Sequence, residues 1–332
     1  MISLPHVYAV GGVFFAATAW FSGRDRSNPR RFRAAAFWGL LALSFLAGDR
    51  LGDLGNGVLV VGLVVLAASG MGRSARETST PEERRASAVR HGDRLFAVAL
   101  VIPATAFAGT LVARQTHWGA RLIDPAQATL VSLALGVLLA LVVAQVWLRP
   151  QFRSPDGVRT LRFPLLVPLR EGRRLLDAVG WAAILPQMLA SLGIVFLMSG
   201  VGTQVGRLFA EHLPLDSRLA AVTAYCLGMA LFTVLMGNAF AAFPVMTAAI
   251  GLPVVVHRFG GAPAVVSAIG MLSGFCGTLM TPMAANFNIV PANLLELPDR
   301  NAPFNAVIRA QVPTAVPLLA VNVLLMWWLA FR

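Results

Sequence analysis

The chain has 332 residues, of which 57% are hydrophobic and only 13% are charged. This composition excludes an ordinary soluble domain, and the apolar residues occur in runs long enough to span a bilayer. The net charge is +12, and all 27 basic residues are arginine. Because these arginines lie in loops between apolar runs, they indicate membrane topology and contact with anionic lipid headgroups. We therefore expect a lipid bilayer as a partner and no nucleic acid.

Ten apolar segments predict an all-α, polytopic transmembrane protein. They cover residues 4–21, 34–48, 54–70, 95–113, 126–148, 178–198, 219–237, 238–256, 262–281 and 313–331. The second and third segments are short for a hydrocarbon core of about 30 Å, so either is a candidate re-entrant segment. No arginine precedes the first segment and five follow it. This pattern is the reverse of a cleavable signal peptide, so we expect the first helix to be retained.

The arginines mark one class of loop. Residues 22–33 hold five arginines, residues 71–94 hold six and residues 149–177 hold seven. Placing these loops in the cytoplasm puts both termini outside and lets every predicted segment cross in alternation. Most of the seven tryptophans, Trp38 among them, lie near segment ends, as an interfacial belt requires.

Two of these loops have further features. Residues 71–94 mix both signs of charge over a polar background, so we expect a solvated connector with a short helix after Thr80-Pro81. In residues 149–177, Pro164 and Pro168 argue against a continuous helix.

The 149–177 segment is the longest cationic break and lies near the middle of the chain. We interpret it as an Arg-rich cytoplasmic linker. It joins an N-terminal transmembrane half, residues 1–148, to a C-terminal transmembrane half, residues 178–332, which carries the candidate site.

Short stretches of similar sequence occur in both halves. Residues 106–112 (AFAGTLV) resemble residues 274–280 (GFCGTLM), and residues 54–57 (LGNG) resemble residues 236–239 (MGNA). An odd number of segments in each half would insert the second half upside down relative to the first. The pattern therefore predicts two inverted-topology halves, an arrangement typical of secondary transporters.

The sequence lacks the motifs that common enzyme classes need. It has no zinc-protease, nucleophile-elbow or phosphate-loop motif, and its five histidines are scattered without metal-ligand spacing. Two pairs, Gly48-Asp49 and Gly52-Asp53, faintly resemble the motifs of intramembrane aspartyl proteases. Both pairs lie at one segment boundary, where a polar turn is the simpler interpretation. We expect no enzyme activity, no metal and no cofactor.

Two interrupted helices in the C-terminal half are the candidate functional elements. The apolar run over residues 219–256 is too long for one crossing, and Gly237-Asn238 interrupts it. Freed backbone groups in hydrocarbon cost several kcal/mol each, so such a break persists only where protein, water or a ligand satisfies it. Residues 274–291 predict a second interrupted helix for the same reason, because threonines and asparagines surround Pro282 in an apolar setting.

We predict that these two breaks line one polar substrate or ion site at mid-membrane. An Asn side chain can hold a carboxylate or a lactam, or help to complete a cation shell. For any single residue, a capped helix end or an interhelical hydrogen bond is the competing interpretation. Gly55 and Asn56 form the corresponding element of the N-terminal half. The predicted site residues are Gly237, Asn238, Gly277, Thr278, Thr281, Pro282, Asn286 and Asn288.

The predicted spans contain no Arg, Asp or Glu. An anionic substrate would then be held by helix N-termini and Asn amides, unless Arg258 or Arg309 reaches in from an edge. Sodium held by carbonyl and hydroxyl oxygens is the simpler coupling ion, because the spans offer no buried carboxylate as a proton carrier. The proton is the alternative coupling ion, because the carboxylates of Asp49, Asp53 or Glu296 lie at segment edges.

Three stretches carry a family resemblance: residues 236–251 (MGNAFAAFPVMTAAIG), 270–291 (GMLSGFCGTLMTPMAANFNIVP) and 310–315 (AQVPTA). They resemble a bacterial membrane family known as domain of unknown function 979. The naming of that family treats its members as one subunit of a pyroglutamate (5-oxoproline) transporter, paired with a second, smaller membrane protein. The resemblance is strongest from about Trp181 onward. It implies a multi-pass protein of the bacterial inner membrane, and it assigns no residue roles.

Taken with the resemblance, the residues predict an ion-coupled secondary transporter for a small organic anion, with pyroglutamate as the substrate and alternating access as the mechanism. A non-catalytic partner subunit of a two-component permease is the main alternative. A membrane-embedded enzyme is the third.

Overall fold

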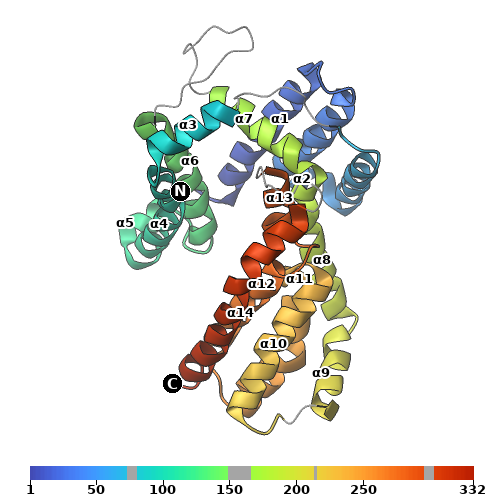
Figure 1. Cartoon of the computed structure of the whole chain (residues 1–332), viewed down its shortest axis with the longest axis vertical. Helices are drawn as coiled ribbons and strands as arrows, with labels where there is room; N and C mark the ends of the chain where they lie inside the picture. The colour runs from blue at the N-terminus through green and yellow to red at the C-terminus, as the bar shows by residue number, and fades with distance from the viewer. Residues whose placement is uncertain (73–80, 149–165, 213–214, 295–302) are drawn as a thin grey trace. The chain divides into compact units, whose positions relative to one another are not determined.

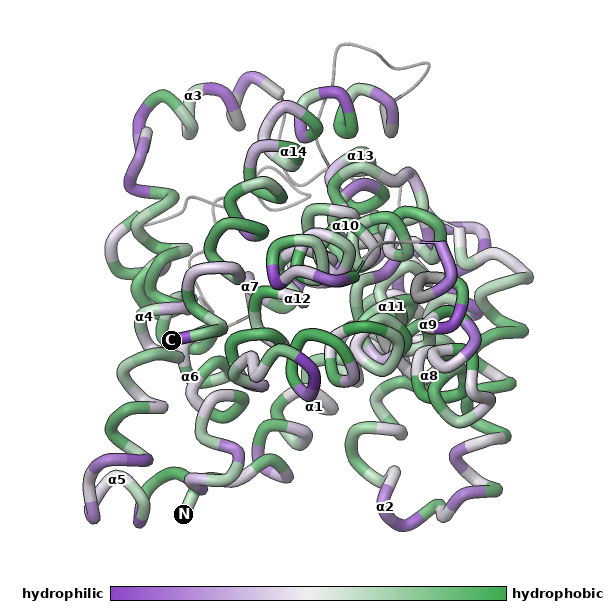
Figure 2. Tube along the Cα trace, turned by 90° about the horizontal axis from the view of Figure 1, so that it is seen from below, coloured by the Kyte–Doolittle hydropathy of each residue, from purple (hydrophilic) through white to green (hydrophobic). Residues whose placement is uncertain are grey.

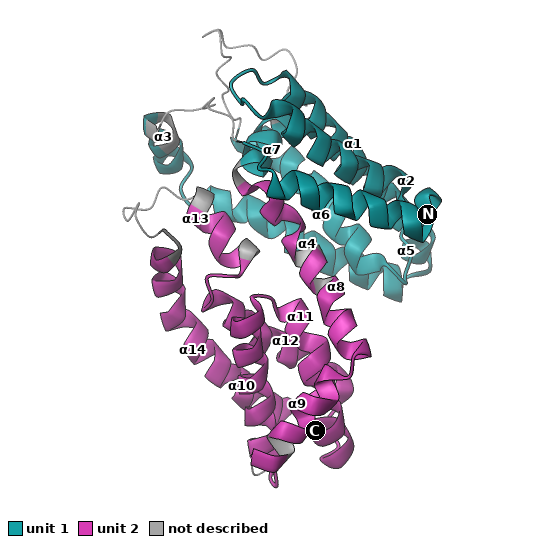
Figure 3. Cartoon of the chain, turned by 90° about the vertical axis from the view of Figure 1, so that its right-hand side faces the viewer, with its two compact units in different colours: residues 1–177 teal, residues 178–332 magenta. Residues whose placement is uncertain are grey.

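A computed structural model describes residues 1–72, 81–148, 166–212, 215–294 and 303–332 (Figure 1). These residues are almost entirely helical. Their one extended pairing is an isolated bridge between Ile2 and Ile123. The chain divides into two compact units, residues 1–177 and residues 178–332 (Figure 3).

Unit 1 consists of helices that are mostly long and apolar. They are α1 (Leu4–Arg24), α2 (Arg31–Ala68), α3 (Pro81–His91), α4 (Arg94–Gln115), α5 (His117–Leu122), α6 (Ala128–Val143) with its π-helical extension η1 (Ala144–Leu148), and α7 (Leu166–Val179), whose last two residues pass the unit boundary. α1 packs on α2, and α4 packs on α6. α3 begins at Pro81, where the sequence predicts a short helix.

α2 is a helical hairpin. At Gly52 the backbone leaves the helix with φ of 62°, a conformation that glycine adopts readily. The Asn56 side-chain amide closes the bend by donating to the Gly48 carbonyl at 2.9 Å. At the other end, Arg33 Nη1 donates to the Ser69 carbonyl at 2.8 Å, so both ends of α2 lie together. The two arms, about 31 and 24 Å long, match the predicted segments 34–48 and 54–70.

Each end of unit 1 gathers segments that the topology prediction puts on one side of the membrane. At one end, the Ile2 N–H donates to the Leu122 carbonyl at 2.6 Å. At the other end, the Asn28 amide donates to the Met71 carbonyl at 3.2 Å. There Arg173 also pairs with Asp25 at 2.8 Å. The second end therefore contains residues of all three Arg-rich loops.

α7 corrects one expectation about the linker. Its helix includes Pro168, which we expected to oppose a helix. The proline lies in the first turn, where the N–H that it lacks would have no intrahelical partner anyway. Residues 149–165, with Pro164, lie outside the described part.

Unit 2 contains more interruptions than unit 1. Its elements are the 3₁₀ turn η2 (Gly180–Ile184), α8 (Leu185–Met198), α9 (Val201–His212), α10 (Arg218–Met236), α11 (Ala239–Met246) with its π-helical continuation η3 (Thr247–Arg258), α12 (Pro263–Leu279), the π-helical turn η4 (Ala285–Ile289), α13 (Val290–Leu294) and α14 (Pro303–Leu329).

The core of unit 2 surrounds α10 and α12. Tyr225 is fully buried, and glycines line its ring. A Cβ at Gly251 would lie 3.0 Å from the ring, and a Cβ at Gly270 would overlap it. Small residues thus let these helices approach closely, as is common between membrane helices. The remaining packing pairs α8 with α11, α9 with η3, and α12 with α14.

Within the described ranges, seven helices are long and apolar enough to cross a membrane, which confirms the helical membrane class. They are Leu4–Arg24, Arg31–Ala68, Arg94–Gln115, Ala128–Leu148, Arg218–Met236, Ala239–Arg258 and Asn305–Leu329. α12 is apolar but shorter, with 17 residues. Figure 2 shows these helices as predominantly hydrophobic, with hydrophilic residues gathered at helix ends and in α3.

Candidate functional site

The first break in unit 2 separates α10 from α11. α10 ends at Gly237, whose φ of 75° is left-handed, and its N–H donates to the Thr233 carbonyl at 2.7 Å. This is the usual glycine helix end. Asn238 then begins α11 as its N-cap, because its Oδ1 accepts from the Phe240 N–H at 2.6 Å. The Asn238 residue is only 8% exposed.

The second break follows α12. The Thr278 hydroxyl donates back to the Phe275 carbonyl at 2.6 Å. The helix stops at Leu279, and the Thr281 hydroxyl accepts from the Met283 N–H at 3.3 Å. Pro282 is exposed at this turn, while Thr281 is buried. The chain then enters the π-helical turn η4.

Asn288 ties this second break together. It is fully buried. Its Nδ2 donates to the Thr278 carbonyl at 2.9 Å and to the Thr281 carbonyl at 2.5 Å. The bond to Thr278 satisfies a carbonyl at the C-terminal end of α12, and the bond to Thr281 adds a second donor to a carbonyl that also accepts from the Ala284 N–H at 3.4 Å. Its Oδ1 is also buried and has no hydrogen-bond partner.

The structure brings the two breaks into contact. A Cβ at Gly237 would lie 2.6 Å from Met283 Cβ and 3.2 Å from the Met283 carbonyl. Gly277 packs α12 against α10, because its Cβ would lie 2.9 Å from Thr233 Cβ. The C-terminal ends of α10 and α12 therefore lie beside the N-terminus of α11. Helix C-termini carry partial negative charge and N-termini partial positive charge, so this region offers poles of both signs.

Unpartnered oxygen atoms also gather on the elements of these breaks. Within the described part of unit 2, the buried side-chain oxygens without a partner are Thr233 Oγ1, Asn288 Oδ1 and Gln311 Oε1. Gln311 reaches the second break, since its Nε2 donates to the Phe287 carbonyl at 3.1 Å. The two amide oxygens are acceptors, and the hydroxyl can accept as well as donate. Each of these oxygens could therefore contact a cation or accept from an N–H group.

The remaining predicted residues have other positions. Asn286 belongs to η4, but its side chain lies outside the described part. Gly55 and Asn56 lie in unit 1, at the bend of the α2 hairpin, where Asn56 has the structural role given above. Asn238 and Asn288 both cap helix ends, which was the competing interpretation for single residues.

The depth of the breaks follows from helix length. At one end of unit 2, Arg218 stacks over the Phe331 ring and the Ala262 N–H donates to the Ala330 carbonyl. α10 and α12 both run away from this end and have 19 and 17 residues. The breaks therefore lie about 28 and 26 Å from it. That is most of the thickness of a hydrocarbon core of about 30 Å, and the mid-membrane position of the site stays a prediction.

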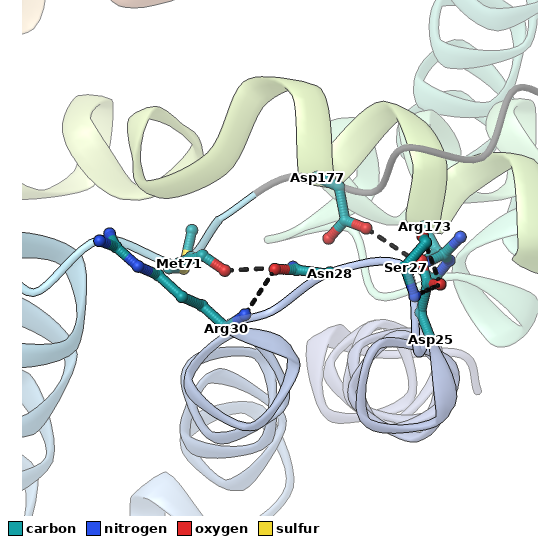
Figure 4. A network of polar contacts seen from close by, with 7 residues as sticks. All are labelled: Asp25, Ser27, Asn28, Arg30, Met71, Arg173 and Asp177. Carbon is teal, nitrogen blue, oxygen red and sulfur yellow. Dashed lines mark hydrogen bonds and ion pairs between the residues drawn. The ribbon is translucent and has the colours of Figure 1, made fainter.

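Sequence reasoning missed a buried charged cluster in unit 1. Asp25 and Asp177 are 5% and 7% exposed, and Arg173 lies between them (Figure 4). Trp38, which we expected in an interfacial belt, is fully buried. Two buried carboxylates therefore exist at the Arg-rich end, outside the predicted spans. One signal was present: Asp25 is the single acidic residue among the five arginines of residues 22–33.

Among the described residues, no three His, Cys, Asp or Glu side chains gather as a metal site. Comparison with curated proteins and with solved structures gives no match for this chain. A family model described as a protein of unknown function (DUF979) matches residues 5–331, nearly the whole chain. The resemblance noted from the sequence is thereby confirmed, and the chain belongs to the DUF979 family.

Proposed function

We propose that the protein is a secondary transporter of a small organic anion, with its substrate site at the paired breaks of unit 2. The observation that carries the proposal is the contact of Gly237 with Met283, which joins two interrupted helices. Interrupted membrane helices whose ends meet are the usual substrate and ion sites of secondary transporters. Three buried oxygens without a partner in the protein also support the proposal, because buried polar groups are usually hydrogen-bonded.

The chemistry of the breaks suits pyroglutamate, the substrate that the family naming indicates. This anion has a carboxylate beside a lactam N–H and carbonyl. The N-terminus of α11 supplies partial positive charge for the carboxylate. Asn288 Oδ1 supplies an acceptor for the lactam N–H or for a coupling cation. Sodium and the proton are the two candidate coupling ions.

The rest of the proposal concerns topology. We place the Arg-rich loops in the cytoplasm of a bacterial cell, with the protein in the inner membrane. Seven of the described helices are long and apolar enough to cross. If α2 crosses as two arms and the shorter helices α8 and α12 also cross, there would be ten crossings, and the two halves would be inverted in the membrane. A second, smaller membrane subunit remains a proposed partner.

Uptake by proteoliposomes tests the function. The purified chain alone should accumulate radiolabelled pyroglutamate in a saturable manner, and excess unlabelled pyroglutamate should compete. If uptake requires the smaller subunit while the chain alone is folded and inserted, the chain is the non-catalytic partner. Absence of uptake in both preparations would refute the transport proposal.

A further inference from the structure

The buried cluster of Asp25, Arg173 and Asp177 in unit 1 has an unusual charge arrangement. A single guanidinium nitrogen, Arg173 Nη1, lies 2.8 Å from Asp25 Oδ2 and 3.2 Å from Asp177 Oδ2 (Figure 4). The three side chains are 4%, 11% and 6% exposed in the order Asp25, Arg173, Asp177. Two carboxylates thus share one cationic nitrogen away from solvent. Carboxylates that share a site rarely both stay ionised.

The two carboxylates have different surroundings. Asp25 Oδ1 accepts from the Ser27 N–H at 3.0 Å and from the Ser27 hydroxyl at 2.7 Å. Asp25 also holds the shorter contact to Arg173. Hydrogen bonds to the charged form and a nearby cation both favour ionisation. Asp25 is therefore the carboxylate that stays ionised, and Asp177 is the one that can accept a proton.

Two buried donors face Asp177. The Ser22 hydroxyl and the Trp38 indole N–H lie beside its carboxyl group, yet neither completes a hydrogen bond within the usual distance and angle limits. Ser22 and Trp38 are 2% and 0% exposed. The indole N–H can donate to either form of the carboxyl, and the hydroxyl can accept from the acid form. These side chains suit a carboxyl group that changes protonation state.

The other charged groups on the elements around Asp177 have partners or lie in solvent. Three arginines stack on aromatic rings: Arg24 over Trp20, Arg31 over Phe32 and Arg170 over Phe21. Arg30 and Arg33 donate to the Ser69 carbonyl, Glu171 pairs with Arg174, and Arg26 is exposed.

The pKa of Asp177 lies above its ordinary value, and burial is the main cause. The Arg173 cation lowers this pKa and the Asp25 charge raises it, while Trp38 and Ser22 lower it. The balance favours proton uptake.

We propose that Asp177 is a proton-binding site at the Arg-rich end of unit 1. Its carboxylate takes up one proton and becomes the neutral acid, and Arg173 then pairs fully with Asp25. In the transporter proposed above, this site makes the proton the coupling ion. The binding of the proton itself does not depend on that function.

Infrared difference spectroscopy of the purified full chain in nanodiscs, titrated with acid in the absence of substrate, tests the site. A protonated carboxyl band should appear at a pH above the ordinary carboxyl range of about pH 4 and should be lost in Asp177→Asn. In Asp25→Asn, Arg173 is free to pair with Asp177, so the titration midpoint should fall by about one pH unit or more. Glu171→Gln, which changes a more exposed pair on the same helix, should leave the band unchanged.

Thermal unfolding gives a second readout. Because the folded chain holds the proton more tightly than the unfolded chain, this stabilisation is present at low pH and is lost as pH rises through the folded-state pKa. The wild-type melting temperature should therefore fall across that window, and Asp177→Asn should remove this part of the fall. A band that persists in Asp177→Asn, or a midpoint that does not move in Asp25→Asn, would overturn the proposal. If Asp177→Asn does not fold, the shift in Asp25→Asn still decides. Loss of transport with an intact titration would count against the proposed function and not against the proton site.

Discussion

The N-cap of α11 is a position where charge can change while the fold is preserved. Asn238 Oδ1 accepts from the Phe240 N–H at 2.6 Å. Asp and Ser cap helices about as well as Asn, and a carboxylate at a helix N-terminus gains roughly 0.3–1 kcal/mol from the helix dipole. Asn238→Asp and Asn238→Ser should therefore both insert and melt close to the wild-type temperature.

The two variants should differ greatly in transport. If the substrate carboxylate binds at this N-terminus, a new carboxylate about 4 Å away repels it by about 4 kcal/mol at an effective dielectric constant near 20. This corresponds to about a thousandfold loss of affinity. Asn238→Ser adds no charge and loses at most one hydrogen bond to a charged ligand, about 1.5–3 kcal/mol. Asn238→Asp should thus be about tenfold or more worse than Asn238→Ser.

Initial rates of pyroglutamate uptake over a range of concentrations would measure the difference, with melting temperatures measured on the same preparations. The comparison isolates charge because both side chains keep the cap. Equal uptake by two stable variants would show that no anion binds near the N-terminus of α11. If only Asn238→Asp melts early, the break is too apolar for a carboxylate, and the electrostatic argument is wrong.

Three further predictions concern packing, capping and topology. Gly277→Ala places a Cβ within 2.9 Å of Thr233 Cβ, so it should lower the free energy of unfolding by about 1–3 kcal/mol. A Cβ at Gly57 would meet nothing within 4 Å, so Gly57→Ala should not destabilise the protein. Thermal unfolding of the two variants measures the difference. Asn288→Leu leaves the Thr278 carbonyl without its amide donor and removes one of two donors to the Thr281 carbonyl, so it should cost about 1–3 kcal/mol in denaturant unfolding. A smaller cost would assign the amide to ligand binding alone. On intact cells, an impermeant maleimide should label Asp216→Cys but not a cysteine at position 79 or 154, and labelling of either loop would reverse the topology.

Much of the fold could be predicted from local sequence. Hydrophobic runs bounded by arginines determine where helices begin and end, and Gly52 allows the bend between two short segments. Gly237 and Pro282 indicated both breaks, because each residue has a conformational limit that does not depend on distant contacts. The start of α3 at Pro81 was predictable for the same reason.

Tertiary contacts could not be predicted in this way. The pairing of Asp25 with Arg173 joins residues 148 positions apart, and no local pattern selects that arginine among so many. The burial of Trp38 likewise depends on how α1, α2 and α7 pack. The orientation of the amides also escaped prediction, because Asn238 and Asn288 turn toward helix ends of their own unit. The hydrophobic pattern of the sequence indicates where a helix forms, but it does not indicate which other helices pack against it.

Substrate protection of a cysteine at the paired breaks tests the location of the site most directly. Met283 is 58% exposed and contacts Gly237, and the two native cysteines are buried. With Met283→Cys, pyroglutamate should slow the reaction with a small maleimide in a saturable manner. It should not slow the reaction of Asp216→Cys at the other end of unit 2. An unchanged labelling rate at Met283→Cys, in a protein that still transports pyroglutamate, would show that the substrate binds elsewhere.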